Sequence, residues 1–311
     1  MTNALSTPGY QRLLELQVNL LGVAQETAAE YDLDVTSPSH PLWAVQYSYL
    51  SMAPMRNGLH VEYFGGTWGD ELDMTLACLA RQDVADVISS LAFSGPDEGA
   101  NGTREWTLEP LLRANVSFPI LRSLYIRPTE PDHHNSSLIS HDGSIMDEGG
   151  DIARLVAKMP FLTEMTVPNA PDASFFQQAL PHLKTLRIGG NFNTQNFIRN
   201  LAGASNLPSL TSLDFTESTE LQMTWAKDRE DAYVTSFDAY EQLFKSPIGE
   251  QLKVLVLRNT RLSREELEHL QSLRKKLQFM VIQAAQGGYV SHFAHNAFPW
   301  KHLVQADPGV N

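Results

Sequence analysis

The segment Leu180-Pro-His-Leu-Lys-Thr-Leu-Arg-Ile188 decides the fold, because its pattern returns as Leu207-Pro-Ser-Leu-Thr-Ser-Leu-Asp-Phe215. In both copies, a leucine after the proline is followed by two variable residues, an apolar residue, one more variable residue and another apolar residue. We number the three apolar residues as repeat positions 1, 4 and 6. Alternation at positions 4 and 6 is typical of a β-strand with one buried face.

The same pattern occurs along most of the chain. Clear copies begin at Leu121, Leu162, Leu183, Leu210 and Leu252, and looser copies begin at Ile88 and Leu277. The starts lie 33, 41, 21, 27, 42 and 25 residues apart. The long intervals require insertions, which the sequence places at 95–104, 128–150 and 217–236.

Short helical segments separate the predicted strands. We expect helices over 151–159, over 173–180 behind a cap at Asp172, over 195–201, over 237–244 and over 265–276. Ser263 and Glu266 form the pattern of a capping box at the start of the last of these. Each unit is therefore predicted to be a strand, a turn and a helix. No single unit can bury its apolar face alone, so the units must stack.

Residues 84–286 resemble the leucine-rich-repeat family in its α/β, ribonuclease-inhibitor-like form. Gln251-Leu-Lys-Val-Leu-Val-Leu-Arg-Asn-Thr-Arg-Leu262 comes closest to the full family pattern, with Asn259 in place of the asparagine that caps the turn after the strand. The resemblance implies an α/β solenoid with a curved parallel sheet on the concave side and helices on the convex side. It also implies a binding scaffold without naming the partner. The irregular repeat lengths and the missing asparagines depart from the family.

The two ends of the chain differ from the repeats. Residues 1–83 are expected to form an N-terminal cap continuous with the solenoid, with a helix over 10–31, a strand over 59–64 and a helix over 70–81. Residues 287–311, rich in aromatic residues and histidine, are expected to form a C-terminal cap.

Composition limits the class of partner. The 23 Lys and Arg against 36 Asp and Glu give a net charge of −13, which disfavours nucleic acids and anionic membranes as partners. The single cysteine excludes an internal disulfide framework, and no export signal or membrane span is visible. These features favour a cytoplasmic module of bacterial style, whose oligomeric state the sequence leaves open.

The variable residues at repeat positions 5 and 7 should line the concave face, where a partner protein would bind. The candidate contact residues are Tyr125, Arg127, Thr166, Arg187, Asp214, Thr216, Val256 and Arg258, together with Trp225 in the third insertion. Arginines on this face suit a partner with an acidic segment. The alternative is that Arg187 pairs with Asp214 on the neighbouring strand.

We therefore expect a non-catalytic protein-binding module with no cofactor and no metal. The sequence contains none of the common nucleotide-binding, hydrolase or zinc motifs. An alternative is an enzyme with a polar site between His133 and Asp151, although Ser140, His141 and Asp142 are neighbours in sequence and do not form a credible triad. A further alternative is a structural subunit in which the N-terminal cap pairs with a second copy.

Overall fold

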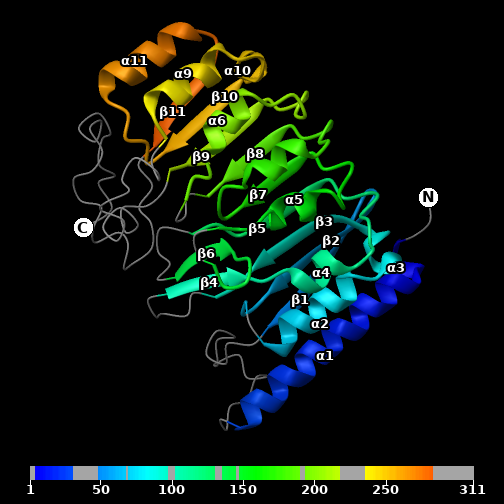
Figure 1. Cartoon of the computed structure of the whole chain (residues 1–311). Helices are drawn as coiled ribbons and strands as arrows, with labels where there is room; N and C mark the ends of the chain where they lie inside the picture. Colours follow the sequence, from blue (N-terminus) through cyan, green and yellow to red (C-terminus); the bar gives the residue numbers. More distant parts are fainter. Residues whose placement is uncertain are drawn as a thin grey trace, which may run out of the picture.

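A computed structural model describes residues 4–30, 48–67, 69–96, 102–129, 135–144, 147–189, 193–217 and 235–282. These residues form a mixed α/β structure, in which helices pack on a nine-stranded, mostly parallel sheet (Figure 1). A separate two-stranded sheet lies beside it. The α/β class with a large parallel sheet is therefore confirmed.

The large sheet has the strand order β1-β2-β3-β5-β7-β8-β9-β10-β11. Its strands are β1 (Tyr49–Met55), β2 (Gly58–Phe64), β3 (Ile88–Ser94), β5 (Ser123–Ile126), β7 (Glu164–Val167), β8 (Thr185–Ile188), β9 (Ser212–Thr216), β10 (Val254–Arg258) and β11 (Gln278–Ile282). Strands β1 and β2 pair antiparallel, and every other neighbouring pair in this sheet is parallel. The strand expected over 59–64 is β2, and it joins the N-terminal region to the repeats through β3.

The strands pair with the repeat positions in register. Leu186 at position 4 of β8 lies opposite Met165 on β7 and Leu213 on β9. The same register runs from Leu91 on β3 to Leu255 on β10.

The last repeat departs from the predicted register by one residue. Leu255 lies opposite Phe279, so positions 4 and 6 fall on Phe279 and Val281 and not on Met280 and Ile282. Met280 is 36% exposed on the other face. Buried Leu277 gave a misleading start to the pattern, because it immediately precedes the strand and does not stand three residues before a core position.

A repeated pair of backbone hydrogen bonds fixes the register where each strand begins. The Lys184 carbonyl accepts the N–H groups of Thr211 at 2.9 Å and Ser212 at 3.0 Å. The Thr163 carbonyl accepts the N–H groups of Lys184 and Thr185 in the same way. Arg122 and Thr211 repeat the arrangement in their own units. Each unit is therefore aligned with the next at the same residue of the repeat.

Most predicted helices are confirmed with small shifts at their ends. The helices are α1 (Pro8–Glu30), α2 (Asp70–Leu79), α3 (Gln82–Ala85), α4 (Glu109–Arg113), α5 (Asp151–Val156), α6 (Phe197–Ala202), α9 (Phe237–Lys245), α10 (Pro247–Gln251) and α11 (Arg264–Leu273), with 3-10 turns η1 (Ala4–Ser6) and η3 (Ala173–Gln177). The capping box of Ser263 and Glu266 forms at α11. Asp172 caps a 3-10 turn where an α-helix was expected, since its side chain accepts the N–H of Ser174.

One apolar core joins the helices to one face of the sheet. Residues at repeat positions 1, 4 and 6, such as Leu183, Leu186 and Ile188, form a single buried cluster with residues of α1, α2, α5, α6 and α9. Residues at position 5, such as Arg187 and Thr166, do not belong to this cluster. The helices therefore cover one face of the sheet, and position 5 points to the opposite face, which we call the open face.

We expected a curved sheet with a concave face, but the sheet that the described residues form is not curled. Curvature requires helices that are wider than the strand spacing, since packed helices lie about 8–10 Å apart and strands about 4.8 Å apart. Between β3 and β9, the units contribute only the short elements α4, α5, η3 and α6, each of five or six residues. These short elements do not force the helical side to spread.

One strand begins in the first insertion, and another lies within the second. β4 (Gly102–Trp106) and β6 (Asn135–Ile139) pair parallel to form the two-stranded sheet. Buried Trp106 packs edge-on against Phe93 and Tyr63 and donates its indole N–H to Ser137 at 3.1 Å. These contacts attach the two strands to the main core. The sequence pattern had placed no strand in either insertion.

Within the described ranges, no helix is long and apolar enough to cross a membrane. The predicted C-terminal cap at 287–311 lies outside the described residues.

The register predicts that substitutions at two neighbouring residues of β8 change the free energy of unfolding by very different amounts. Leu186→Ala should lower the free energy of unfolding by about 2–5 kcal/mol, because it leaves a cavity in the core. Thr185→Ala on the exposed side should change it by less than about 0.5 kcal/mol. Urea unfolding measures both. Equal effects would contradict the assignment of the two faces.

Candidate functional site

The open face carries a continuous row of side chains at repeat position 5. Tyr125 on β5 lies opposite Thr166 on β7, which lies opposite Arg187 on β8. Arg187 lies opposite Asp214 on β9, which lies opposite Val256 on β10. The structure therefore brings these five candidate residues into one row, as the repeat predicts.

Asp214 pairs with Arg258 and not with Arg187. The Arg258 guanidinium donates from Nε to Asp214 Oδ1 at 2.7 Å and from Nη2 to Oδ2 at 2.8 Å. This two-bond geometry holds both side chains firmly. The alternative pairing of Arg187 with Asp214 is therefore wrong. Among the described residues, the Arg187 side chain makes no ion pair, and it is half-buried in the centre of the row.

The other candidates are less available to a partner. Val256 and Thr216 are buried, with 7% and 6% of their surface exposed. Arg127 is partly exposed, and its Nη1 donates to the Gly95 carbonyl at 3.3 Å. Trp225 lies outside the described residues.

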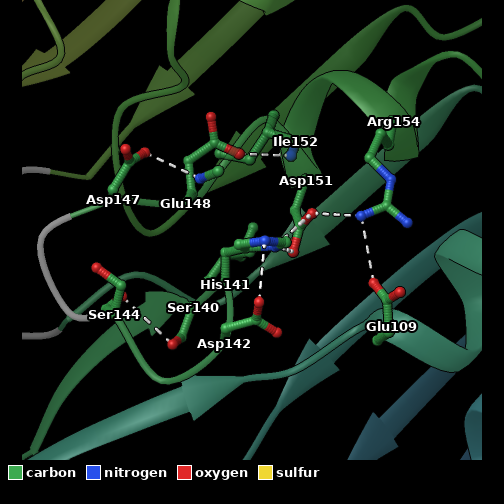
Figure 2. A network of polar contacts seen from close by, with 12 residues as sticks. Glu109, Ser140, His141, Asp142, Ser144, Asp147, Glu148, Asp151, Ile152 and Arg154 are labelled. Atoms are coloured by element: carbon green, nitrogen blue, oxygen red, sulfur yellow. Dashed lines mark hydrogen bonds and ion pairs between the residues drawn. The ribbon is translucent and has the colours of Figure 1, made fainter.

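A second polar cluster lies at the end of the second insertion, around His141 (Figure 2). His141 begins a tight turn with Asp142 and Gly143 in the left-handed region, and its ring Nδ1 lies 3.3 Å from both carboxylate oxygens of Asp151. Asp151 is buried and also accepts from Arg154 Nη1 at 2.9 Å. The hydrogen bond that the His141 ring donates to the Asp151 carboxylate raises the pKa of His141.

The cluster continues to α4 and fastens the insertion to the helices. Arg154 Nη1 also donates to Glu109 at 3.2 Å, and Glu109 pairs with Arg113. Gly149 has a positive φ of 59°, and a Cβ there would come within 2.5 Å of the His141 ring. A side chain at this position would therefore displace the histidine.

Buried Glu148 connects the same insertion to the next repeat. Its carboxylate accepts the N–H of Ile152 at 2.7 Å and the N–H of Asp172 at 2.8 Å. Burial raises the pKa of Glu148 to about 7, although both hydrogen bonds favour the charged form.

The geometry does not assemble a catalytic triad from Ser140, His141 and Asp142. The Ser140 hydroxyl donates to the Ser144 carbonyl at 3.3 Å, and His141 Nδ1 contacts Asp151. His133 and His134 lie outside the described residues. Within the part of the chain that the structure describes, no group of three His, Cys, Asp or Glu side chains could hold a metal ion.

Repeat position 8 is a buried polar position that the sequence analysis missed. It holds Asn169, Glu217 and Asn259 in three repeats, and all three are buried. The Asn169 amide bonds to both the N–H and the carbonyl of Ile139 and so extends the β4–β6 sheet. The signal was available, since each residue follows position 6 by two. Only Asn259 was recognised, because it lies in the repeat that is closest to the family pattern. Glu217 is not an asparagine, and Asn169 lies in a repeat that fits the pattern less well.

Glu217 closes the base of the third insertion. Its carboxylate accepts the N–H of Thr235 at 3.3 Å, the Thr235 hydroxyl at 3.1 Å and the Tyr240 hydroxyl. Burial raises the pKa of Glu217 to about 7. The two ends of the insertion are thus joined through one buried carboxyl group.

This raised pKa predicts a stability that falls as pH rises. The folded protein holds the Glu217 proton more tightly than the unfolded chain, whose carboxyl has the ordinary pKa of 4.5. The contribution is complete below about pH 4.5 and is lost as pH rises through about 7. Between about pH 6 and about pH 8, the parent protein should therefore lose about 1 kcal/mol more unfolding free energy than the Glu217→Gln variant.

Urea unfolding at several pH values measures this difference. Glu268→Gln, at an exposed residue of α11, is the control and should leave the pH dependence unchanged. If Glu217→Gln shows the same pH dependence as the parent protein, Glu217 does not titrate as described.

Comparisons with known proteins give no family. No family model matches the chain, and no curated protein matches it. Among solved structures, the chain is similar to a crystal structure of a protein from Bacteroides fragilis, with 17% sequence identity and a TM-score of 0.35. The match covers 71% of this chain and 65% of the other, so the chain spans less than two thirds of that protein. It assigns neither a family nor a function.

Proposed function

We propose that this chain is a non-catalytic module that binds another protein through the open face of its sheet. The observation that carries the proposal is the ion pair of Asp214 with Arg258, which leaves Arg187 in the centre of the face without a carboxylate partner among the described residues. A half-buried guanidinium gains most from a partner carboxylate that bonds to it through two oxygens.

The residues around Arg187 fit such a contact. Thr166 flanks it on β7 with a hydroxyl group, and Tyr125 stands one strand further along the row. Tyrosine and arginine are among the side chains enriched at the centres of protein interfaces. In this proposal, an acidic side chain of the partner contacts Arg187. The partner residues next to that side chain contact the row from Thr166 towards Tyr125.

We further propose that the repeats are of the leucine-rich-repeat kind. Support comes from the repeated register and from the shared backbone pairing at the start of each strand. The flat sheet departs from the curved form of that family. A cytoplasmic location for the module is part of the same proposal.

An enzymatic role at the His141 cluster has less support. Asp151 is already occupied by Arg154 and His141, and Glu148 by two backbone N–H groups. Among the described residues, no serine, threonine or cysteine side chain bonds to His141. These contacts explain the cluster as the attachment of the second insertion to α4 and α5.

The test begins with identification of the partner. A photo-crosslinking residue in place of Thr166 should capture a discrete protein, whereas the same residue in place of Glu268 on α11 should not. The captured protein, identified by mass spectrometry and purified, then serves as the ligand in titrations.

Arg187→Glu should weaken binding of that protein by at least about tenfold, because it places like charges together at the contact. The melting temperature should hardly change, since Arg187 has no ion pair among the described residues to lose. Arg199→Glu makes the same charge change at an exposed residue of α6, on the helical side, and is the matched control. Unchanged affinity in Arg187→Glu would refute the proposed site.

A further inference from the structure

A row of exposed cations lies along the edge where the strands begin, at repeat position 2. This position holds Arg122, Thr163, Lys184, Thr211 and Lys253 in successive strands from β5 to β10. The backbone groups of these residues are used in the hydrogen bonds between repeats. Arg122, Lys184 and Lys253 are all exposed, so their side chains are available for contacts with a partner. We call these three residues the cationic edge.

The charges of the cationic edge are not neutralised by ion pairs with the residues that the structure describes. Other exposed cations differ from one another: Arg113, Lys245 and Arg264 pair with Glu109, Glu241 and Glu268. Arg199 and Lys276, like the cations of the edge, make no ion pair among the described residues. Among the described residues, none of the three cations of the edge makes an ion pair.

Around the cationic edge, three further cations and three acidic residues balance one another, so the positive excess of this region is that of the edge itself. Arg56 in the β1–β2 turn and Lys275 and Lys276 before β11 lie at the same edge of the sheet. The acidic residues there are Asp86, Glu164 and Glu250, all exposed.

An exposed aromatic ring holds the first cation in place. The Arg122 guanidinium lies 4.9 Å from the centre of the Phe161 ring, and its Nη1 donates to the Phe161 carbonyl at 2.9 Å. His182 stacks on the same ring at 5.4 Å, and Phe161 remains 40% exposed. The edge therefore offers an ordered cation and an apolar contact beside it.

We propose that the cationic edge binds an acidic α-helix of a partner protein. The three cations stand on alternate strands, so their attachment points are about 9.6 Å apart, or two strand spacings. A helix returns to the same face after seven residues, which is about 10.5 Å. An extended peptide advances about 10 Å in three residues, but these residues point to opposite sides.

A nucleic acid fits this spacing less well. Its phosphates follow one another about every 3.4 Å along each strand, and the intervening Thr163 and Thr211 would leave several of them without a cation. The edge is also distinct from the open face, so this inference goes beyond the proposed function and does not depend on Arg187.

The test uses a synthetic helical peptide of about 20 residues with all its glutamates on one face, labelled for fluorescence anisotropy. Its reference is a peptide of the same composition with the glutamates spread around the helix. The triple variant Arg122→Gln, Lys184→Gln, Lys253→Gln is compared with the matched triple variant Arg113→Gln, Lys245→Gln, Arg264→Gln, which also removes three exposed cations.

We expect the first triple variant to bind the one-faced peptide about tenfold more weakly than the parent protein, and the matched variant to bind it as the parent does. The parent should prefer the one-faced peptide to its reference, and salt should weaken the binding. Circular dichroism and the melting temperature verify that both variants fold. Equal affinity of the parent and the first variant overturns the proposal. Tighter binding of a single-stranded oligothymidylate than of the peptide overturns the choice of a protein helix.

Discussion

The structure depends on the backbone hydrogen bonds that align each repeat with the next. The carbonyl of repeat position 2, as in Lys184, accepts two N–H groups from the following strand, and this pairing recurs from β5 to β10. Side chains alternate between the two faces of a strand, so a shift by one residue would exchange the core residues with those of the open face. The register therefore decides which side chains are buried and which are available to a partner.

This alignment gives the sheet three separate surfaces. Positions 4 and 6 build the core with the helices, position 5 builds the open face, and position 2 places cations along the edge where the strands begin. Charge is distributed differently within the open face and along the cationic edge. Arg258 is neutralised by Asp214, whereas Arg187 and Lys184 have no ion pair among the described residues.

The insertions are attached by buried polar groups. Asn169 completes the hydrogen bonding of β6, Glu148 holds the second insertion to the next repeat, and Glu217 joins the ends of the third. A buried polar group must keep its hydrogen bonds, because leaving one unmade costs about 1–3 kcal/mol. The polar residues at repeat position 8 are therefore structural, and the raised pKa values of the two glutamates follow from burial.

The sequence by itself determined the repeat strands from β3 to β10 in the main sheet, the identity of their core positions and the row from Tyr125 to Val256, because alternation and repeat spacing are local properties of the chain. It misplaced β11 by one residue, since Leu277 is buried without belonging to the strand. Only the tertiary structure decided that Asp214 pairs with Arg258, that β4 and β6 form a second sheet, and that the main sheet stays flat. Each of these depends on distances between residues that are far apart in the chain, which the spacing of side chains within one repeat does not encode.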